Sequence, residues 1–484
     1  MFRHARRFRL IAGMLPALLL LSNCSVNPAT GRQQVNFFSE AEEIEMGRQA
    51  DEEIVAEVGL YDDPELQAYV EELGQELAAE SERPNLPWSF KVLDDPAINA
   101  FALPGGYVYV TRGIISHLES EAELATVIGH EIGHVTARHG VNQMSKQMLA
   151  VAGLGVATIL SETANDWAEV AALGLGLAFL KYSRDDERQA DELGLRYSER
   201  TGFDLRESPR VFDLLDRASR VEGVGRLPKW LSTHPDPGAR RVRVQEKVAA
   251  LEASGTSFDG TRIERDGYLA RLDGMVFGEN PREGYFREGE LIHPDLRFRF
   301  RFPDGWETAN EKASVTAMSP AEDAMVQITL AGQSTPEAAA DAFFEEDGVS
   351  REKSWRREVH GLPASWNRWE AATEDGSNLR GTVAFISHQG NVFQILAMAQ
   401  ADDWDGYEDD VESAIASFAR LNDAEAQKVQ PKTMKVVRLK KAMTLEEFAR
   451  AYPSTVDLAT LALINHVDPG ARLEANTLVK RVVG

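Results

Sequence analysis

The chain has 484 residues, of which 43% are hydrophobic and 27% are charged, and its formal net charge is −25 at pH 7. The length exceeds what one hydrophobic core usually supports and the composition is that of a globular protein, so we expect several folded domains. The acidic excess disfavours nucleic acid as a partner, because nucleic-acid binding needs a basic surface.

The N-terminus has the pattern of an export signal. Four arginines lie within the first nine residues, and a mainly apolar run from Leu10 to Leu21 follows. A basic segment before about a dozen apolar residues is typical of a secretory signal and is too short to span a bilayer. Residues 21–24, Leu-Ser-Asn-Cys, resemble a bacterial lipobox, and Cys24 is the only cysteine. We therefore predict a lipoprotein signal peptide over residues 1–24, lipidation of Cys24, and a periplasmic protein anchored to the outer membrane. A secreted precursor with an incidental cysteine is the alternative.

Residues 25–38 are polar and contain Gly, Pro and Asn, which predicts a tether. Ser39 and Glu42 have the spacing of a capping box and predict the start of a helix. A second amphipathic helix is predicted over residues 66–77. Short β-rich runs predict strands at residues 90–93 and 107–110.

A further helix is predicted from Ser120 to Gly140. Ser120 and Glu123 again have capping-box spacing, and an apolar face follows them. Beyond this helix lie two apolar runs, at residues 148–160 and 168–180. Each has about 13 residues, whereas a membrane span needs about 20, so we predict two buried or groove-lining helices. A membrane-dipping hairpin is the alternative.

The segment His130-Glu131-Ile132-Gly133-His134 lies within this predicted helix. Positions four apart lie on one face of a helix, so His130 and His134 can bind the same zinc ion. Glu131 follows the first histidine directly and can accept the proton of a water in the open coordination position. A chance match is the alternative, and the capped amphipathic context disfavours it. His139, near the helix end, is expected to interact with the helix dipole and not with metal.

A catalytic zinc site needs a third protein ligand. The acidic segment 182–191 offers Glu187, and Asp191 lies one helical turn later, where it can accept a hydrogen bond from a ligand histidine. An acidic helical turn is usually a solvated face when it stands alone. Beside the histidine pair it predicts one zinc ion per chain, held by His130, His134 and Glu187.

Four motifs in order resemble one peptidase family. They are residues 99–106 (Asn-Ala-Phe-Ala-Leu-Pro-Gly-Gly), 130–134, 182–191 and 232–235 (Ser-Thr-His-Pro). Together they resemble the zinc metalloendopeptidase family of the CAAX prenyl endopeptidases, HtpX and BepA, over roughly residues 40–250. The resemblance implies a mainly helical zincin fold of the gluzincin type with a small edge-strand sheet, the same three zinc ligands, and Glu131 as the base.

The resemblance also implies roles that spacing alone does not give. His234 corresponds to the family's late histidine, proposed either to assist the transition state or to occupy the open zinc position as a brake. By itself it would be a turn histidine before a proline. The strand from Tyr107 to Val110 is expected to pair with an extended substrate. The candidate substrate-binding residues are Asn99, Ala100, Phe101, Tyr107, Val108 and Tyr109.

The second half of the chain predicts two more folded parts. Residues 296–302 alternate strictly between apolar and basic side chains, which predicts a half-buried strand. Residues 293–294 (His-Pro), 302–306 (Phe-Pro-Asp-Gly-Trp) and 417–418 (Ser-Phe) resemble the PsbP/Mog1-like family, and this resemblance implies an α+β sandwich. The last 50 or so residues predict the order strand–helix–helix–strand. They resemble a LysM module, which binds the glycan of peptidoglycan. The predicted fold class is α+β, with a peptidase domain (39–255), a linker (256–292), the sandwich (293–425) and the βααβ module (430–484).

These predictions favour a zinc-dependent metalloendopeptidase that hydrolyses internal peptide bonds of misfolded or misassembled cell-envelope proteins. Its expected partners are those unfolded proteins, the membrane through the lipid anchor, and peptidoglycan, but not nucleic acid. The alternative is a chaperone-like or peptidoglycan-binding envelope lipoprotein with a latent or regulatory zinc site. A structural zinc site is a third reading, in which all four positions would be closed and no base would be needed.

Overall fold

The computed structural model describes residues 24–153, 181–220, 230, 233–345, 348–372 and 378–484. The chain divides into two units. Unit 1 contains the residues up to Val55, Leu60–Gly278 and Thr433–Val483, and unit 2 contains Glu279–Lys432 with the short segment Ala56–Gly59. The chain thus leaves unit 1 after Gly278 and returns to it at Thr433, so unit 2 is an insertion in unit 1.

Two predictions fall outside the described residues. The signal peptide is described only at Cys24, and the apolar runs only at residues 148–153. Among the residues that are described, every helix lacks the length or the hydrophobicity needed to cross a membrane.

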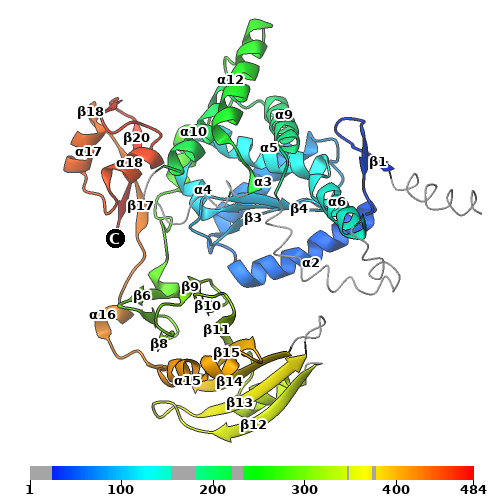
Figure 1. Cartoon of the computed structure of the whole chain (residues 1–484). Helices are drawn as coiled ribbons and strands as arrows, with labels where there is room; N and C mark the ends of the chain where they lie inside the picture. The colour runs from blue at the N-terminus through cyan, green and yellow to red at the C-terminus, as the bar shows by residue number, and fades with distance from the viewer. Residues whose placement is uncertain (1–23, 154–180, 221–229, 231–232, 346–347, 373–377) are drawn as a thin grey trace, which may run out of the picture. The chain divides into compact units, whose positions relative to one another are not determined.

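Unit 1 combines helices with small sheets (Figure 1), and the predicted α+β class is confirmed. Its helices are α2 (Glu40–Val58), α3 (Pro64–Ala79), α4 (Arg112–His117), α5 (Glu121–Thr136), α6 (His139–Gly153), α9 (Arg184–Arg200), α10 (Ser208–Ala218), α12 (Pro237–Ala253), α13 (Arg265–Arg271), α17 (Leu445–Ala451) and α18 (Leu458–Ile464). Its strands are β1 (Cys24–Val26), β2 (Gln33–Val35), β3 (Ser89–Leu93), β4 (Ala100–Leu103), β5 (Tyr107–Thr111), β17 (Thr433–Arg438), β18 (Met443–Thr444), β19 (Arg472–Leu473) and β20 (Leu478–Val483).

The residues after Cys24 form a hairpin, so the predicted tether over residues 25–38 is wrong. Strands β1 and β2 pair antiparallel along their whole length. The side-chain amide of Asn27 donates to the carbonyl of Ala137 at 3.2 Å. That of Asn142 donates to the carbonyl of Val35 at 2.6 Å. These hydrogen bonds hold the hairpin against the start of α6.

Strands β3, β5 and β4 form a sheet in that order, with β5 parallel to β3 and antiparallel to β4. The prediction that Tyr107–Val110 pairs with an extended substrate is therefore wrong, because β5 already has a neighbour on each side. Within the described part of the chain, β4 has β5 as its one neighbour. The candidate substrate residues divide accordingly, with Tyr107, Val108 and Tyr109 in β5, Ala100 and Phe101 in β4, and Asn99 just before β4.

Helix α5 has the predicted N-cap but a different hydrogen-bond partner for Glu123. The hydroxyl of Ser120 accepts from the Glu123 N–H at 3.2 Å, which satisfies a free donor of the first turn. The carboxylate of Glu123 accepts from the Glu119 N–H at 2.7 Å, so the reciprocal bond of a capping box is not made to Ser120.

The helix was predicted to continue to Gly140, but it ends at Thr136. Arg138 has a φ of 59°, in the left-handed region that a right-handed helix cannot include. Its guanidinium donates to the carbonyl of Phe38 at 2.8 Å, which fixes this turn against the segment after the hairpin. Helix α6 then begins at His139.

Helices α5 and α9 lie side by side at the centre of unit 1, and glycines let their backbones approach closely. A Cβ added to Gly133 would come within 2.9 Å of the Ala190 carbonyl oxygen, and one added to Gly194 would come within 2.8 Å of the backbone nitrogen of His130. These contacts are shorter than real Cβ contacts. The spacing between the two helices therefore depends on glycine at both positions.

The segment 256–292, predicted as a linker, is largely folded. Its helix α13 contributes Tyr268 and Leu269 to the same buried core as α3, α5 and α10. The chain leaves this core at Gly278 and returns at Thr433, which forms an isolated β-bridge with Val276.

The C-terminal module, Thr433–Val483, packs into the core of unit 1. Strands β17 and β20 pair antiparallel and enclose α17 and α18 in sequence, giving the βααβ order. From β20 the fully buried amine of Lys480 donates to the Leu118 carbonyl at 2.6 Å and lies 3.2 Å from the Glu119 carboxylate. Burial lowers the pKa of Lys480. The module therefore supplies a fully buried cation at the junction of α4 and α5, beside Arg265, which also pairs with Glu119.

We expect Lys480→Met to lower the free energy of unfolding by roughly 3 kcal/mol, because the buried Leu118 carbonyl loses its donor and the buried Glu119 carboxylate loses one of its two cations, the other being Arg265. Lys435→Met in the paired strand β17 is the control. Lys435 is half exposed and contacts Asp273 at 2.6 Å, and such surface pairs contribute about 1 kcal/mol or less. Urea unfolding of both variants measures the difference. Equal, small losses would contradict the role of Lys480.

Unit 2 is built on two antiparallel sheets. The larger has the order β12-β13-β14-β15-β11-β10-β9 and the smaller β16-β8-β7-β6. Helix α14 packs on the larger sheet, while α15 contacts β14 and β8. The strands are β6 (Tyr285–Arg287), β7 (Glu290–His293), β8 (Phe298–Arg301), β9 (Glu307–Asn310), β10 (Val315–Met318), β11 (Ala324–Leu330), β12 (Val349–Arg356), β13 (Ala364–Ala372), β14 (Asn378–His388), β15 (Asn391–Gln400) and β16 (Ala419–Arg420). The helices are α14 (Pro336–Phe343), α15 (Glu408–Ala416) and α16 (Ala424–Gln427).

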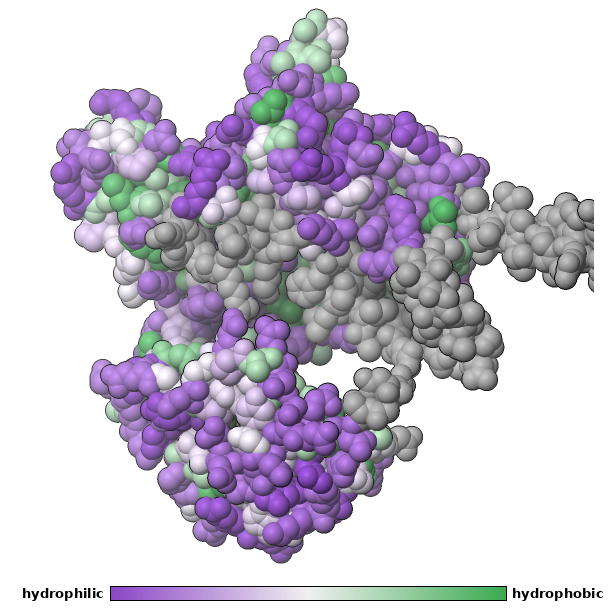
Figure 2. Space-filling model, viewed as in Figure 1, coloured by the Kyte–Doolittle hydropathy of each residue, from purple (hydrophilic) through white to green (hydrophobic). Residues whose placement is uncertain are grey.

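Strand β8 is the alternating strand predicted within residues 296–302. Phe298 and Phe300 are buried, whereas Arg299 and Arg301 are exposed, as the period of a strand with one solvated face requires. The face of the molecule seen in Figure 2 carries mainly hydrophilic residues where the atoms are coloured, in keeping with the net charge of −25.

Candidate metal centre

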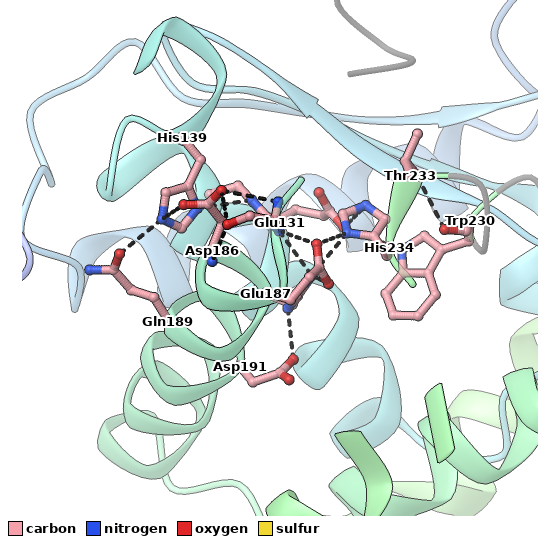
Figure 3. A network of polar contacts seen from close by, with 12 residues as sticks. Glu131, His139, Asp186, Glu187, Gln189, Asp191, Trp230, Thr233 and His234 are labelled. Atoms are coloured by element: carbon pink, nitrogen blue, oxygen red, sulfur yellow. Dashed lines mark hydrogen bonds and ion pairs between the residues drawn. The ribbon is translucent and has the colours of Figure 1, made fainter. Parts of the chain in front are cut away.

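Three elements bring the candidate residues together (Figure 3). Helix α5 supplies His130, Glu131 and His134, helix α9 supplies Glu187, and His234 precedes α12. One ligand atom from each of His130, His134, Glu187 and His234 lies within 4.8 Å of the others, and all four residues are buried. Elsewhere in the described ranges no group of this kind occurs.

The spacing of these atoms fits a metal ion of the size of zinc. The Nε2 atoms of His130 and His134 are 3.0 Å apart, and the Glu187 carboxylate lies 3.5 Å from the latter and 3.6 Å from the former. Nδ1 of His234 is 3.4 Å from His130 Nε2 and 2.8 Å from Glu187 Oε1. Ligands bound tetrahedrally to zinc at about 2.0–2.1 Å are about 3.3 Å from one another. Two imidazoles with a carboxylate are also a typical donor set for this metal.

Glu131 lies beside this donor set and is not part of it. Its Oε1 is 3.8 Å from Nε2 of His234 and accepts a hydrogen bond from the Trp230 indole at 3.5 Å. Its Oε2 is buried and has no hydrogen-bond partner among the residues that the structure describes. A buried carboxylate oxygen without a partner is available to a water or to a substrate.

Asp191 contacts the far side of one histidine. Its Oδ1 lies 3.0 Å from Nδ1 of His130, so the ring can donate there and keep the lone pair of Nε2 for the donor set. Burial acts to raise the pKa of Asp191, but the Arg240 guanidinium and the His130 ring lower it well below its ordinary value. Asp191 is therefore ionised and a strong acceptor.

Arg240, on α12, was missed by the sequence analysis. It is fully buried, and its guanidinium lies 2.8 Å from the Glu187 carboxylate and 2.5 Å from that of Asp191. Trp230 and Phe212 cover it, with ring centroids 4.6 and 4.7 Å from its central carbon. Despite burial, the charges of His234 and Arg240 lower the pKa of Glu187. The positive charge of Arg240 thus compensates the negative charges of Glu187 and Asp191, the two carboxylates of α9 that lie next to the histidines.

His139 lies next to the donor set without joining it. Its Nδ1 is 3.0 Å from Nδ1 of His134, and its Nε2 is 2.9 Å from Gln189 Oε1. Tyr182 stacks on the ring of His134, with ring centroids 4.0 Å apart. Burial lowers the pKa of both histidines. The sequence predicts only a contact with the helix dipole here, so the hydrogen-bond contact between His139 and His134 is a correction.

Comparison with known proteins places the donor set in a family. The sequence model of peptidase family M48 matches residues 64–248 of this chain. The beta-barrel assembly-enhancing protease of Escherichia coli (strain K12) is 30% identical over 266 residues, which cover 51% of this chain and 53% of that protein. The Yersinia pestis protein of the same name is 33% identical over 253 residues, with 51% and 50% covered. The mitochondrial metalloendopeptidase OMA1 of Schizosaccharomyces pombe is 30% identical over 268 residues, 52% of this chain and 76% of that protein. The chain belongs to peptidase family M48.

This membership confirms the family predicted from the four motifs, and it confirms a metallopeptidase at the level of the family. The chain spans about half the length of the bacterial relatives it matches. The matched residues of family M48 end at 248, within α12, so they include all the candidate ligands but neither unit 2 nor the C-terminal module.

Solved structures add little for the rest of the chain. The cyanobacterial PsbP of Synechocystis is 13% identical with a TM-score of 0.23, covering 27% of this chain and 91% of that chain. The Ran-binding protein Mog1p of Saccharomyces cerevisiae is 10% identical with a TM-score of 0.23, covering 29% and 99%. These TM-scores are too low to support a shared fold, so the PsbP/Mog1-like sandwich at residues 293–425 stays a prediction.

Proposed function

We propose that the protein is a zinc-dependent metalloendopeptidase that hydrolyses internal peptide bonds of misfolded or misassembled cell-envelope proteins. The observation that carries the proposal is the meeting of His130, His134 and Glu187, from two helices, with the Glu131 carboxylate beside them. The names of the bacterial relatives, beta-barrel assembly-enhancing proteases, support the envelope as the place of action.

In this proposal His130, His134 and Glu187 hold the metal. When bound, the metal would polarise a peptide carbonyl and lower the pKa of a bound water to about 7. Glu131 accepts the proton of the attacking water through its unpartnered Oε2 and passes it to the leaving amine. Trp230 holds the other oxygen of Glu131. Asp191 and Arg240 keep the ligand side chains of the two helices in place.

The substrate would lie along β4. This strand packs against α5 and has β5 as its one neighbour in the described ranges, so its outer edge can accept an extended peptide. Of the residues first considered for substrate binding, Ala100 and Phe101 lie in β4 and Asn99 adjoins it. Backbone pairing of this kind suits unfolded chains, because it does not depend on one sequence.

For location we propose export, lipidation of Cys24 and attachment to the outer membrane, with peptidoglycan as an added partner of the LysM-like module. The pattern of residues 1–24 supports the anchor. Since the hairpin begins at Cys24 and accepts a hydrogen bond from Asn142 on α6, the anchor would hold the peptidase domain close to the membrane surface.

The donor set contains a fourth side chain, and we propose that His234 acts as a brake. A catalytic zinc site keeps one position open, whereas Nδ1 of His234 lies within the donor set. We expect His234→Ala to raise the rate of casein cleavage about tenfold, which corresponds to a site closed about nine-tenths of the time. His360→Ala, at an exposed turn of unit 2, is the control. Loss of cleavage in His234→Ala would instead assign His234 a catalytic role.

Casein cleavage by the purified protein tests the proposed function itself. We expect cleavage at internal bonds that stops when a chelator removes the metal and returns when zinc is restored. The His234→Ala variant is assayed in parallel, because a closed site could hide activity in the wild type. No cleavage by either metal-loaded protein would overturn the proposal. It would favour the chaperone-like reading with a latent or regulatory metal site.

A further inference from the structure

Three side chains form a hydrogen-bonded series that leads away from the donor set. His134 on α5, His139 at the start of α6 and Gln189 on α9 are consecutive members of it, and Figure 3 shows Gln189 directed at the His139 ring. The two Nδ1 atoms of the histidines are 3.0 Å apart. The Gln189 Oε1 atom is 2.9 Å from Nε2 of His139.

Only one arrangement of protons satisfies both contacts with neutral rings. A neutral imidazole has one N–H donor and one acceptor nitrogen, and an amide oxygen only accepts. Gln189 therefore requires the proton of His139 on Nε2, which leaves Nδ1 of His139 as an acceptor. The 3.0 Å contact between the two Nδ1 atoms then requires His134 to donate. The proton of His134 lies on Nδ1, and the lone pair of its Nε2 is directed at the donor set.

Several contacts keep His139 in this position. Tyr182 stacks on His134 with the ring planes 29° apart, so the ring cannot easily rotate away from His139. The turn before His139 is held by the left-handed Arg138 and its hydrogen bond to Phe38. The Asn27 amide binds the carbonyl of Ala137 in the same turn. The N-terminal hairpin thus supports the start of α6, and the position of His139 in the hydrogen-bonded series depends on this start.

We propose that His139 is a positioning residue of the metal centre, which accepts a hydrogen bond from His134 in a tautomer fixed by Gln189. This inference rests on the proposed metal centre. The two histidine ligands then have different outer partners. His130 donates to the carboxylate of Asp191 at 3.0 Å, a charged acceptor, whereas His134 donates to a neutral ring. Partners of this kind orient a ligand and raise its affinity for metal.

Metal affinity of the full chain, measured by competition with a chromophoric chelator, tests this role. His139→Phe keeps a ring but removes the acceptor, and we expect a 10–100-fold weaker zinc affinity, the usual cost of losing such a partner. Gln189→Leu removes the hydrogen-bond acceptor of His139 Nε2 but leaves the Asp186 carboxylate, 3.7 Å from the same nitrogen. Gln189 is half-buried, so this variant should fold. We expect it to weaken zinc binding less than His139→Phe. Gln189→Glu retains an acceptor oxygen and should bind zinc as the wild type does.

His388→Phe is the matched control, because His388 is also buried and hydrogen-bonded but lies in unit 2. The tautomers provide a second readout that does not need metal. Nitrogen-15 spectra of the metal-free protein should show the proton of His134 on Nδ1 and that of His139 on Nε2. Wild-type affinity in both His139→Phe and Gln189→Leu, or a His139 protonated on Nδ1, would overturn the inference. A wild type that binds no metal would overturn the proposed function, and the tautomers would still decide whether the hydrogen-bond chain exists.

Discussion

Replacement of Glu131 by glutamine is expected to reduce peptide-bond cleavage by about 10²–10⁴-fold, the usual contribution of a general base. Glutamine has nearly the same shape as glutamate but cannot take a proton from water at neutral pH. Since Glu131 is outside the donor set, the zinc content should stay that of the wild type. Initial rates of casein cleavage and metal analysis on the same preparation measure both effects. The His234→Ala background increases the sensitivity of the assay.

The control for this prediction is Glu192→Gln. Glu192 is an exposed glutamate on α9, so its replacement removes the same charge without touching the site. Undiminished cleavage by Glu131→Gln would exclude Glu131 as the base. A loss of zinc together with activity would mean that Glu131 acts on the donor set and not on water.

Replacement of Arg240 by methionine is expected to lower the free energy of unfolding of the metal-free protein by about 3–5 kcal/mol, the cost of leaving buried charges without their partner. Glu187 and Asp191 would both lose the guanidinium, their permanently charged partner. The contacts with Trp230 and Phe212 would remain largely filled by the methionine side chain. Urea unfolding in the presence of a chelator measures the effect.

Arg241→Met, at the next position, is the matched control. Arg241 and its partner Asp213 are both more than a third exposed, so its loss should cost about 1 kcal/mol or less. Zinc should restore part of the stability of Arg240→Met, because the metal binds Glu187 and replaces one of the two lost interactions. Equal stability of the two variants would contradict the role assigned to Arg240.

The part of the site that lies within one helix could be predicted from sequence. Helical geometry brings residues four apart onto one face, which gives His130 with His134 and Glu187 with Asp191. The meeting of α5 with α9 needed the family resemblance, because the close approach at Gly133 and Gly194 is a tertiary contact.

Arg240 was missed because its local sequence is misleading. It begins the run Arg240-Arg241-Val242-Arg243, and such a run reads as a solvated basic face. In the fold Arg240 is buried against Glu187 and Asp191 on α9. Arg241 pairs with Asp213 on α10 and stays partly exposed. Whether a charged side chain is buried depends on residues that are distant in the sequence, and a local sequence pattern does not include them.

The order of strands in a sheet was also beyond the sequence. Residues 107–110 were correctly predicted as a strand, but their place in the middle of the sheet follows from pairing with β3 and β4. The hairpin after Cys24 and the return of the C-terminal module to unit 1 are likewise tertiary. Polar, glycine-containing residues such as 25–38 resemble a tether until their hydrogen-bond partners elsewhere in the fold are known.

The central claim is that His130 and His134, with Glu187, hold one zinc ion per chain. Metal analysis of the purified full-length protein beside the double variant His130→Ala/His134→Ala tests it most directly. We predict one equivalent of zinc in the wild type and essentially none in the variant, which retains only Glu187 and His234 of the donor set. A wild type without a divalent metal, or a variant that keeps the wild-type content, would contradict the claim.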